Sequence, residues 1–568
     1  MITKKLWKRM IAMALIIVMA IVMAACGKGK EENSGDSIVP GDETKVEAQD
    51  PFGAYAETLQ VEIGRPIEPG KVGPDGGSHE ENAIRTHIKD TLNVEYTYVI
   101  EAANSTDYGQ QLSLAIAGEE LPDIFTIYDR NTLDELVENE LVADLTEIYE
   151  DYASDDLKAM YDAYNYSVLD RATYGGKLMA LPRCSPELES LVWIRQDWVE
   201  ALGVTVDEDG NNLITREELE ELARKFIEAD PGESGNPVGF SIIPNITEDA
   251  DASISVVNNS FGAFNRKWLQ GEDGSIYSGS TLPEAKDALA WWADMFQKGI
   301  LDPQYGTRTW DDIIELMVNG QLGIVFGEMS CPAWMFTNVY AANPDARFNA
   351  YALDTGEGYA VTPYYNSVNR WVVARKDYEH PELVLKFANI IRDITGNPNL
   401  AEENSVLYEY VVAGTVIDYF DPVTMANYPA DDWTSRYIGV RDYLNGDIMR
   451  EDIRNPRILA DIDAVERYQK DPAALSPEEL GNYEWCMKGI KTVVELNEQE
   501  LIRYVSPLYL GNTETMNSKK ADLDKLEEET YIKIITGELS VDGFDSFVEE
   551  WMEIGGAKIA EELAEKVR

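Results

Sequence analysis

Short hydrophobic patterns typical of strands alternate with longer patterns typical of helices along the first part of this chain. The strand patterns, in which apolar residues alternate with polar ones or run together, cover residues 59–63, 94–100 and 123–127. Between and after them, apolar residues recur at helical spacing over residues 80–92, 107–117 and 131–137. Strand–helix alternation is typical of a mostly parallel sheet covered by helices on both faces, so we predict an α/β fold.

The carboxyl ends of the strands are where such sheets bind their ligands. This rule places Tyr128, Asp129 and Arg130, which follow the third strand pattern, at the expected ligand edge. A solvated loop explains the same three residues equally well.

A second α/β region follows the first. Residues 191–195 form an apolar strand pattern, residues 196–202 are expected to be helical, and residues 323–326 form another strand candidate. Beyond about residue 400 the patterns are mostly helical, and the sequence has no internal repeat. A length of 568 residues suits two or three folding units with a large core.

The N-terminus has the pattern of an export signal. Basic residues within the first nine positions precede an uncharged apolar run over residues 10–25, and Cys26 follows two alanines. This order is typical of a signal peptide (1–25), because the apolar run is short for a membrane span. It resembles the lipobox of bacterial lipoproteins, which implies a lipid on Cys26; an ordinary signal peptide with a chance cysteine is the alternative. The polar stretch 26–50 predicts a flexible tether.

The composition narrows the classes of partner. The net charge of −55 argues against nucleic acid as a partner, because binding to phosphates requires cationic contacts. It also repels anionic lipid head groups, so only the lipid anchor would hold the protein at a membrane. Apart from Cys26, the cysteines are Cys184, Cys331 and Cys486, which predict no zinc site and at most one disulfide.

Several motifs stand in a definite order along the mature chain. They are Asp107–Leu112 with Ala117–Phe125, Tyr174–Pro182, Leu191–Trp198, Gly320–Gly327, Asn369–Val373 with His380–Glu382, and Gly537–Gly556. Their order resembles that of family 1 extracellular solute-binding lipoproteins of bacterial ABC (oligo)saccharide importers, in the larger subgroup that includes aldouronate binders. One departure is Gly323-Ile324, which replaces the usual Ala-Met of the family.

The resemblance implies a two-lobe, type II periplasmic-binding-protein-like fold whose hinge closes on a ligand. The first lobe would comprise residues 51–185 with 354–400. The second lobe would comprise residues 186–353 with 401–568, the latter a helical C-terminal extension. A monomer is expected, anchored on the outer face of the cytoplasmic membrane of a single-membrane bacterium, with permease subunits of the importer as partners.

Saccharide sites combine flat aromatic rings with carboxylates and arginines. The family places a stacking aromatic after the strand at 323–326, which favours Trp334, with Glu328 in the turn before it as a hydroxyl acceptor. The further candidates are Trp268, Trp371, Tyr128, Trp193 and Arg195. For each tryptophan a place in the core is the alternative.

One acidic loop matches the spacing of an EF-hand calcium loop. Its ligand positions fall on Asp207, Asp209, Asn211, Leu213 (through its main-chain oxygen), Thr215 and Glu218. No cofactor is required by this interpretation, and a structural Ca²⁺ is the only metal expected. A hairpin turn followed by a helix that Thr215 caps explains the same residues.

We therefore expect a protein that captures an oligosaccharide and delivers it to an ABC importer. Two alternatives stay open at this point: the same fold with a peptide or a small anionic solute as ligand, and a surface glycoside hydrolase. The second would need two carboxylates at a set separation, and no catalytic motif supports it. Presentation of the ligand to a membrane sensor kinase is a further role that the sequence leaves open.

Overall fold

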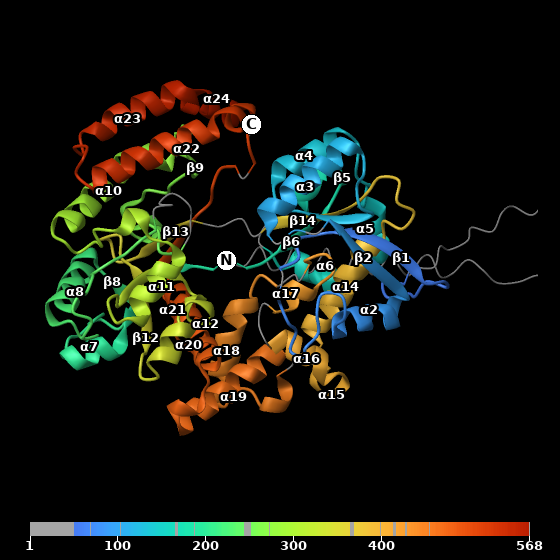
Figure 1. Ribbon diagram of the computed structural model, residues 1–568, viewed down its shortest axis with the longest axis horizontal. Helices are drawn as coiled ribbons and strands as arrows, with labels where there is room; N and C mark the ends of the chain where they lie inside the picture. The colour runs from blue at the N-terminus through green and yellow to red at the C-terminus, as the bar shows by residue number, and fades with distance from the viewer. Residues whose placement is uncertain are drawn as a thin grey trace, which may run out of the picture. The chain divides into compact units, whose positions relative to one another are not determined.

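The computed structural model describes residues 50–566 except 69, 101, 103, 165–167, 187, 244–250, 272, 364–367, 398, 413–415, 426–428, 454 and 510. The predicted signal peptide, Cys26 and the tether up to residue 49 lie outside the described residues. Figure 1 colours the chain from its N-terminus to its C-terminus.

The first sheet has five strands in the order β2-β1-β3-β14-β6. Its strands are β1 (Leu59–Gly64), β2 (Val94–Ile100), β3 (Ile124–Ile127), β6 (Leu181–Cys184) and β14 (Val368–Ala374). Its helices are α2 (Ala83–Leu92), α3 (Ser105–Gly118), α4 (Arg130–Glu138), α5 (Thr146–Tyr152), α6 (Asp155–Asp162) and α14 (Leu383–Gly396). A two-stranded hairpin, β4 (Thr173–Tyr174) and β5 (Lys177–Leu178), precedes β6.

This sheet is mostly parallel, as the sequence predicted, and one of its five strands, β14, runs against the others. Strand β1 is parallel to β2 and β3, but β14 is antiparallel to both β3 and β6. The chain leaves the sheet at the end of β6 and returns only at β14. Because it re-enters at the edge where β6 ended, β14 has to run in the opposite direction.

The second sheet has four strands in the order β11-β7-β12-β8. Its strands are β7 (Ser190–Arg195), β8 (Leu213–Ile214), β11 (Ile324–Glu328) and β12 (Phe348–Leu353). The helices of this region are α7 (Gln196–Leu202), α8 (Arg216–Ala229), α9 (Ser255–Phe261), α10 (Pro283–Gln297), α11 (Trp310–Val318), α12 (Cys331–Trp334) and α13 (Thr337–Ala342). Two smaller ladders pair β9 (Trp268–Gln270) with β10 (Ile276–Ser278) and β13 (Ala360–Pro363) with β15 (Ile502–Val505).

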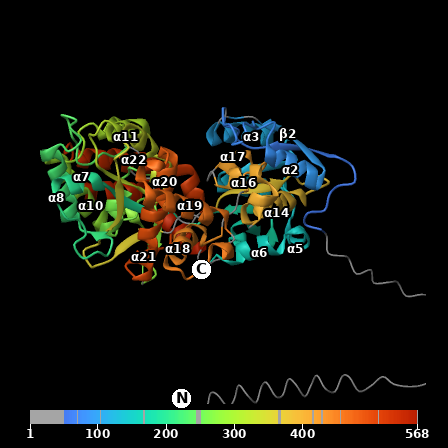
Figure 2. The same cartoon turned by 90° about the horizontal axis from the view of Figure 1, so that it is seen from below.

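The part beyond residue 400 is mostly helical, as predicted. It contains α15 (Leu400–Glu403), α16 (Ser405–Val412), α17 (Val416–Phe420), α18 (Asp432–Asn445), α19 (Pro456–Lys470), α20 (Pro477–Glu484), α21 (Lys491–Glu498), α22 (Glu514–Ile535), α23 (Gly543–Trp551) and α24 (Ala557–Lys566). Helix α22 packs against α10 (Figure 1), and α20 packs against α12 and α13. Helix α16 lies beside α14 and α2 (Figure 2), so this part of the chain also contacts helices of the first sheet.

The apolar side chains form two clusters that correspond to the hydrophobic patterns of the sequence. One contains the five-stranded sheet with its helices, together with much of α16 to α21. The other lies between the four-stranded sheet, α8, α10 and the C-terminal helices α22 to α24. The α/β fold class is therefore confirmed, and the predicted lobe boundaries stay a prediction.

The structure also bears on the cysteines and on membrane contact. Cys184, Cys331 and Cys486 are buried and free, so no disulfide joins them. In residues 50–566, as far as they are described, no helix has both the length and the apolar character needed to cross a bilayer.

Candidate functional site

Three neighbouring strands bring one row of polar side chains to the carboxyl edge of the five-stranded sheet. Arg183 of β6 is paired with Arg370 of β14, and Tyr128 lies one position beyond the pair of Ile127 with Trp371. Side chains at laterally matched positions share a face of a sheet, so Tyr128, Arg370 and Arg183 form a row. The Arg370 guanidinium carbon lies 5.2 Å from the centre of the Tyr128 ring, within the range of a cation–π contact.

The segment around α17 lies against this row and adds two carboxyl groups. Asp418 forms an ion pair with Arg183 at 3.2 Å, and Arg65, which follows β1, donates to the main-chain oxygen of Asp421. Burial raises the pKa of the Asp421 carboxyl to about 6. Among the described residues, Asp418 Oδ1 and Asp421 Oδ2 are buried without a hydrogen-bond donor. An unsatisfied buried acceptor is costly, and a ligand hydroxyl that reached either oxygen would remove that cost.

A second pair of carboxyl groups lies at the end of β11 in the other sheet. The main-chain N–H of Glu328 donates to Asp251 Oδ1, and the Ser330 hydroxyl donates to Glu328 Oε2 at 3.2 Å. Burial raises the pKa of both side chains, and the charge of Asp251 raises that of Glu328 further. The pair therefore holds a proton near neutral pH, and one of its carboxyls can donate a hydrogen bond as well as accept one.

The predicted stacking residue, Trp334, is the most exposed aromatic side chain among the large exposed apolar residues of the described chain. It is 44% exposed at the end of α12. The half-buried Trp310, at the start of α11, packs edge-on against it with ring centres 5.9 Å apart. Together the two indoles form an accessible aromatic surface of the kind on which a sugar ring stacks.

Two other tryptophans proposed from the sequence lie in the core. Trp268 is 9% exposed and packs against Trp551, with ring centres 5.7 Å apart. Trp371 is 4% exposed, and its indole N–H finds no acceptor among the described residues. Their roles in ligand binding stay predictions, which this burial does not favour.

Trp193 and Arg195 share a face of β7, but that face is buried. The Trp193 indole N–H donates to the main-chain oxygen of Glu328 at 3.1 Å, and its ring packs edge-on against Phe336. Arg195 is 2% exposed and forms an ion pair with Asp197. Through Trp193, strand β7 therefore holds the main chain at Glu328 in place. A direct ligand contact by either residue stays a prediction.

The acidic loop at 207–218 satisfies much of its own polar chemistry. The Asp207 carboxylate accepts from the main-chain N–H groups of Asn211 and Asn212, at 3.0 and 2.8 Å. Thr215 caps α8 with Glu218 in a reciprocal capping box. Within the described residues, no group of three or more His, Cys, Asp or Glu side chains lies where it could hold a metal ion. Calcium binding through these residues, with Asp209 and Leu213, stays a prediction.

The other two residues of the predicted ligand edge have local partners. Asp129 is the N-cap of α4 and accepts from the Thr132 N–H at 2.8 Å. Arg130 forms an ion pair with Asp134 at 2.7 Å. Of the three residues after β3, only Tyr128 therefore belongs to the row with Arg370.

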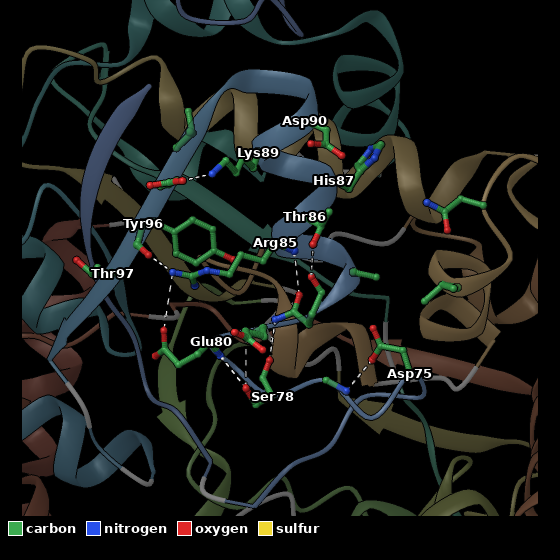
Figure 3. A pocket seen from close by; sticks show the side chains of 18 of the residues that line it. Asp75, Ser78, Glu80, Arg85, Thr86, His87, Lys89, Asp90, Tyr96 and Thr97 are labelled. Carbon is green, nitrogen blue, oxygen red and sulfur yellow. Dashed lines mark hydrogen bonds and ion pairs between the residues drawn. The ribbon is translucent and has the colours of Figure 1, made fainter. Parts of the chain in front are cut away.

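A separate hollow of about 970 Å³ lies beside α2 and the edge strand β2. Figure 3 shows Arg85 between Tyr96 and Glu80; its guanidinium carbon lies 3.9 Å from the centre of the Tyr96 ring. Tyr96 is only 1% exposed, and Lys89 pairs with Glu95. Because the tyrosine that lines this hollow is buried and several of its charges are paired, the hollow fits a sugar less well than the sheet edge does.

Sequence reasoning missed the arginine row and Trp310. Arg370 lies within the motif Asn369–Val373, and Arg183 directly follows the motif Tyr174–Pro182, but their pairing across β6 and β14 depends on long-range topology. Trp310 follows Thr309, which caps α11 in a capping box, and that local signal predicts a helix start and not a binding role.

The sequence of this chain is similar to those of known binding proteins. Residues 89–391 match the family model described as bacterial extracellular solute-binding protein. The lipoprotein LipO of Bacillus subtilis (strain 168) is 20% identical over 509 residues, which cover 86% of this chain and 89% of that protein. The polygalacturonan/rhamnogalacturonan-binding protein YtcQ of the same organism is 21% identical over 562 residues, 98% of each chain.

One solved structure adds support for the fold. The structure of an HMO-binding solute-binding protein of an ABC transporter from Bifidobacterium longum infantis superposes on this chain with a TM-score of 0.59 at 14% sequence identity. The match covers 89% of this chain and 98% of that protein. It shows that the two chains share a fold.

Proposed function

Because this chain belongs to the bacterial extracellular solute-binding proteins, we propose that it captures an oligosaccharide between two lobes and delivers it to an ABC importer. The family match over residues 89–391 carries this proposal. The sheet edge with Tyr128 and Arg370, and the indole pair of Trp334 and Trp310, supply the polar and aromatic groups that sugars require. YtcQ, which aligns over 98% of the chain, is named for binding a polysaccharide.

The ligand acts through closure of the hinge. A ligand held by groups of both lobes stabilises the closed form, because it binds that form more tightly than the open one. Recognition of the closed form by the permease then couples capture to import. The chain works as a monomer and requires no catalytic residue.

The N-terminal signal gives this receptor its location. Lipid on Cys26 and the tether to residue 50 keep the protein at the outer face of the membrane, within reach of the permease. The relative LipO is named a lipoprotein, which supports this part of the proposal.

Calorimetric titration of the lipoprotein, extracted in detergent, against a panel of oligosaccharides and peptides tests the proposal. Saturable binding of one or more oligosaccharides, with unchanged ligand recovered afterwards, is the expected result. Binding of peptides but of no saccharide would refute the proposed ligand class. Recovery of cleaved saccharide would instead establish an enzyme.

A further inference from the structure

The segment 328–334, which contains the candidate ligand residues Glu328 and Trp334, packs against a helix from the C-terminal part of the chain. Helix α20 continues through a π-helical segment, Trp485–Ile490, into α21. Both α20 and the π-helical segment contact α12, and α20 lies close to α12 in Figure 1. The candidate ligand residues therefore lie on a segment whose packing partner is remote in the sequence.

Two buried glycines of this helix approach the main chain of segment 328–334 closely. A Cβ atom on Gly489 would lie 2.2 Å from the main-chain oxygen of Met329, and a Cβ atom on Gly481 would lie 2.3 Å from that of Pro332. Carbon and oxygen atoms in van der Waals contact stay about 3.5 Å apart, so a side chain at either position requires a movement of about 1 Å. Only glycine fits this contact as it stands.

The π-helical segment explains why both glycines face the same neighbour. Gly481 and Gly489 are eight residues apart, which in a regular α-helix places them about 80° away from alignment. A π-helical turn takes up one extra residue, which reduces this offset to about 20°. The irregular segment between the two glycines therefore brings them onto one face of the helix, along segment 328–334.

Both features are unusual inside a helix, and both occur at this contact. Glycine is unfavourable in a helix interior, and π-helical turns are rare and frequent at functional sites. Neither glycine has a positive φ, so the conformation of the backbone does not require glycine at either position. The close approach to segment 328–334 is the structural reason for both glycines.

Other contacts fix the helix, so it does not give way easily. Glu484 Oε2 accepts hydrogen bonds from the Tyr340 hydroxyl at 2.7 Å and from the Phe348 N–H at 3.2 Å. The Thr492 hydroxyl donates to the main-chain oxygen of Ala350 at 3.2 Å. Helix α12, by contrast, is a single turn that ends in an exposed side chain. A side chain at either glycine would therefore displace the segment that carries the candidate ligand residues.

We propose that Gly481 and Gly489 are positioning residues for ligand binding, which set through main-chain contacts where Trp334 and Glu328 meet the oligosaccharide. This inference rests on the proposed function, since it assigns the residues that position two candidate ligand contacts of the same site. It makes the helix over residues 477–498 part of the binding machinery, although none of its side chains is assigned to the ligand.

Titration calorimetry on the wild type and on Gly481→Ala tests this role. The probes are trigalacturonate, xylotriose, maltotriose and cellotriose, and the trisaccharide that the wild type binds most tightly is used for the variants. Gly481→Ala should raise its Kd roughly five- to tenfold, because a displaced Trp334 ring loses at most what removal of the ring loses. Normal affinity in folded Gly481→Ala would overturn the inference and leave the proposed function standing. Absence of wild-type binding to all four probes would overturn both.

Gly232→Ala is the matched control. A Cβ atom on Gly232 would lie 2.1 Å from the main-chain oxygen of Gly320, a clash as close as the one at Gly481. Gly320 precedes β11, whereas Glu328 ends that strand, so the clash lies at the opposite end. Gly232→Ala should lower the melting temperature as Gly481→Ala does, but it should bind the trisaccharide normally. Equal losses of affinity in the two variants would overturn the positioning role.

A double variant gives a readout that general destabilisation does not change. If Gly481 acts through Trp334, adding Gly481→Ala to Trp334→Ala should raise the Kd by less than about twofold further, because the ring that it positions is already absent. A further loss as large as that of Gly481→Ala alone would refute the coupling.

Amide hydrogen exchange on the wild type needs no variant to fold. The saturating trisaccharide should slow exchange in segment 328–334 and in residues 480–490 together, by about threefold or more, and leave α23 unchanged. Protection of segment 328–334 without residues 480–490 would contradict the inference.

Discussion

Removal of the Trp334 ring should weaken saccharide binding without unfolding the protein. Trp334 is 44% exposed, and a tryptophan side chain has roughly 250 Å² to bury, so about 110 Å² of it is open to a ligand. If a sugar face covers half of that area, the loss at about 25 cal/mol per Å² is about 1.4 kcal/mol. Trp334→Ala should therefore raise the Kd for the bound oligosaccharide by about tenfold.

Titration calorimetry on wild type, Trp334→Ala and Trp334→Phe measures this effect. Trp334→Phe keeps an aromatic ring and should lose less than Trp334→Ala. The melting temperature of the free protein should change little, because Trp334 lies at the surface with 44% of its area exposed and its main aromatic neighbour is Trp310. Phe52→Ala, at another exposed aromatic position, is the control and should bind normally. An unchanged Kd in Trp334→Ala would refute a stacking role for this indole.

Four further predictions follow from particular contacts. Burial raises the pKa of Glu527 to about 8, so the folded state binds more protons than the unfolded state between pH 4.5 and 8, and stability should fall as pH rises through that window. Chemical denaturation at pH 5 and pH 8 measures this loss of unfolding free energy, and Glu527→Gln should reduce it by an amount on the order of a few kcal/mol. An equal loss in wild type and Glu527→Gln would show that the carboxyl ionises normally. If the loop at 207–218 binds calcium as its spacing predicts, millimolar calcium should raise the melting temperature, and Asp207→Asn should abolish the rise; no rise would leave the turn and the capped helix as the loop's whole role. Arg436 and Asp461 form a buried bidentate pair at 2.8 Å, so Arg436→Met should destabilise by about 3–5 kcal/mol in urea unfolding, and a loss below 1 kcal/mol would contradict the pair's burial. Cys26→Ser should release the protein from membranes into the medium, and retention on the membrane by immunoblot would contradict the lipid anchor.

Local patterns predicted the elements well because their causes are local. The helix expected over residues 196–202 coincides with α7, and the helix that Thr215 caps begins at Arg216, as a capping box requires. The strand patterns at 94–100 and 123–127 correspond to β2 and β3. Alternation and capping act within a few residues, so a single sequence contains enough information to find them.

Features that depend on distant residues were harder to predict. The direction of β14 follows from where the chain re-enters the sheet, some 180 residues after β6, and no local pattern encodes it. The exposure of the candidate tryptophans could not be predicted for the same reason. Trp334 is exposed, whereas Trp268 is covered by Trp551, which lies far away in the sequence. Burial of a large aromatic residue is decided by tertiary contacts, and a list of tryptophans cannot reveal it.

A crystal structure of the protein with its oligosaccharide tests the central claim most directly. The account predicts sugar at the carboxyl edge of the five-stranded sheet, with Arg370 and Tyr128 in contact with one unit and the Trp334 ring against another. Sugar bound in the hollow beside α2, with the sheet edge empty, would contradict it.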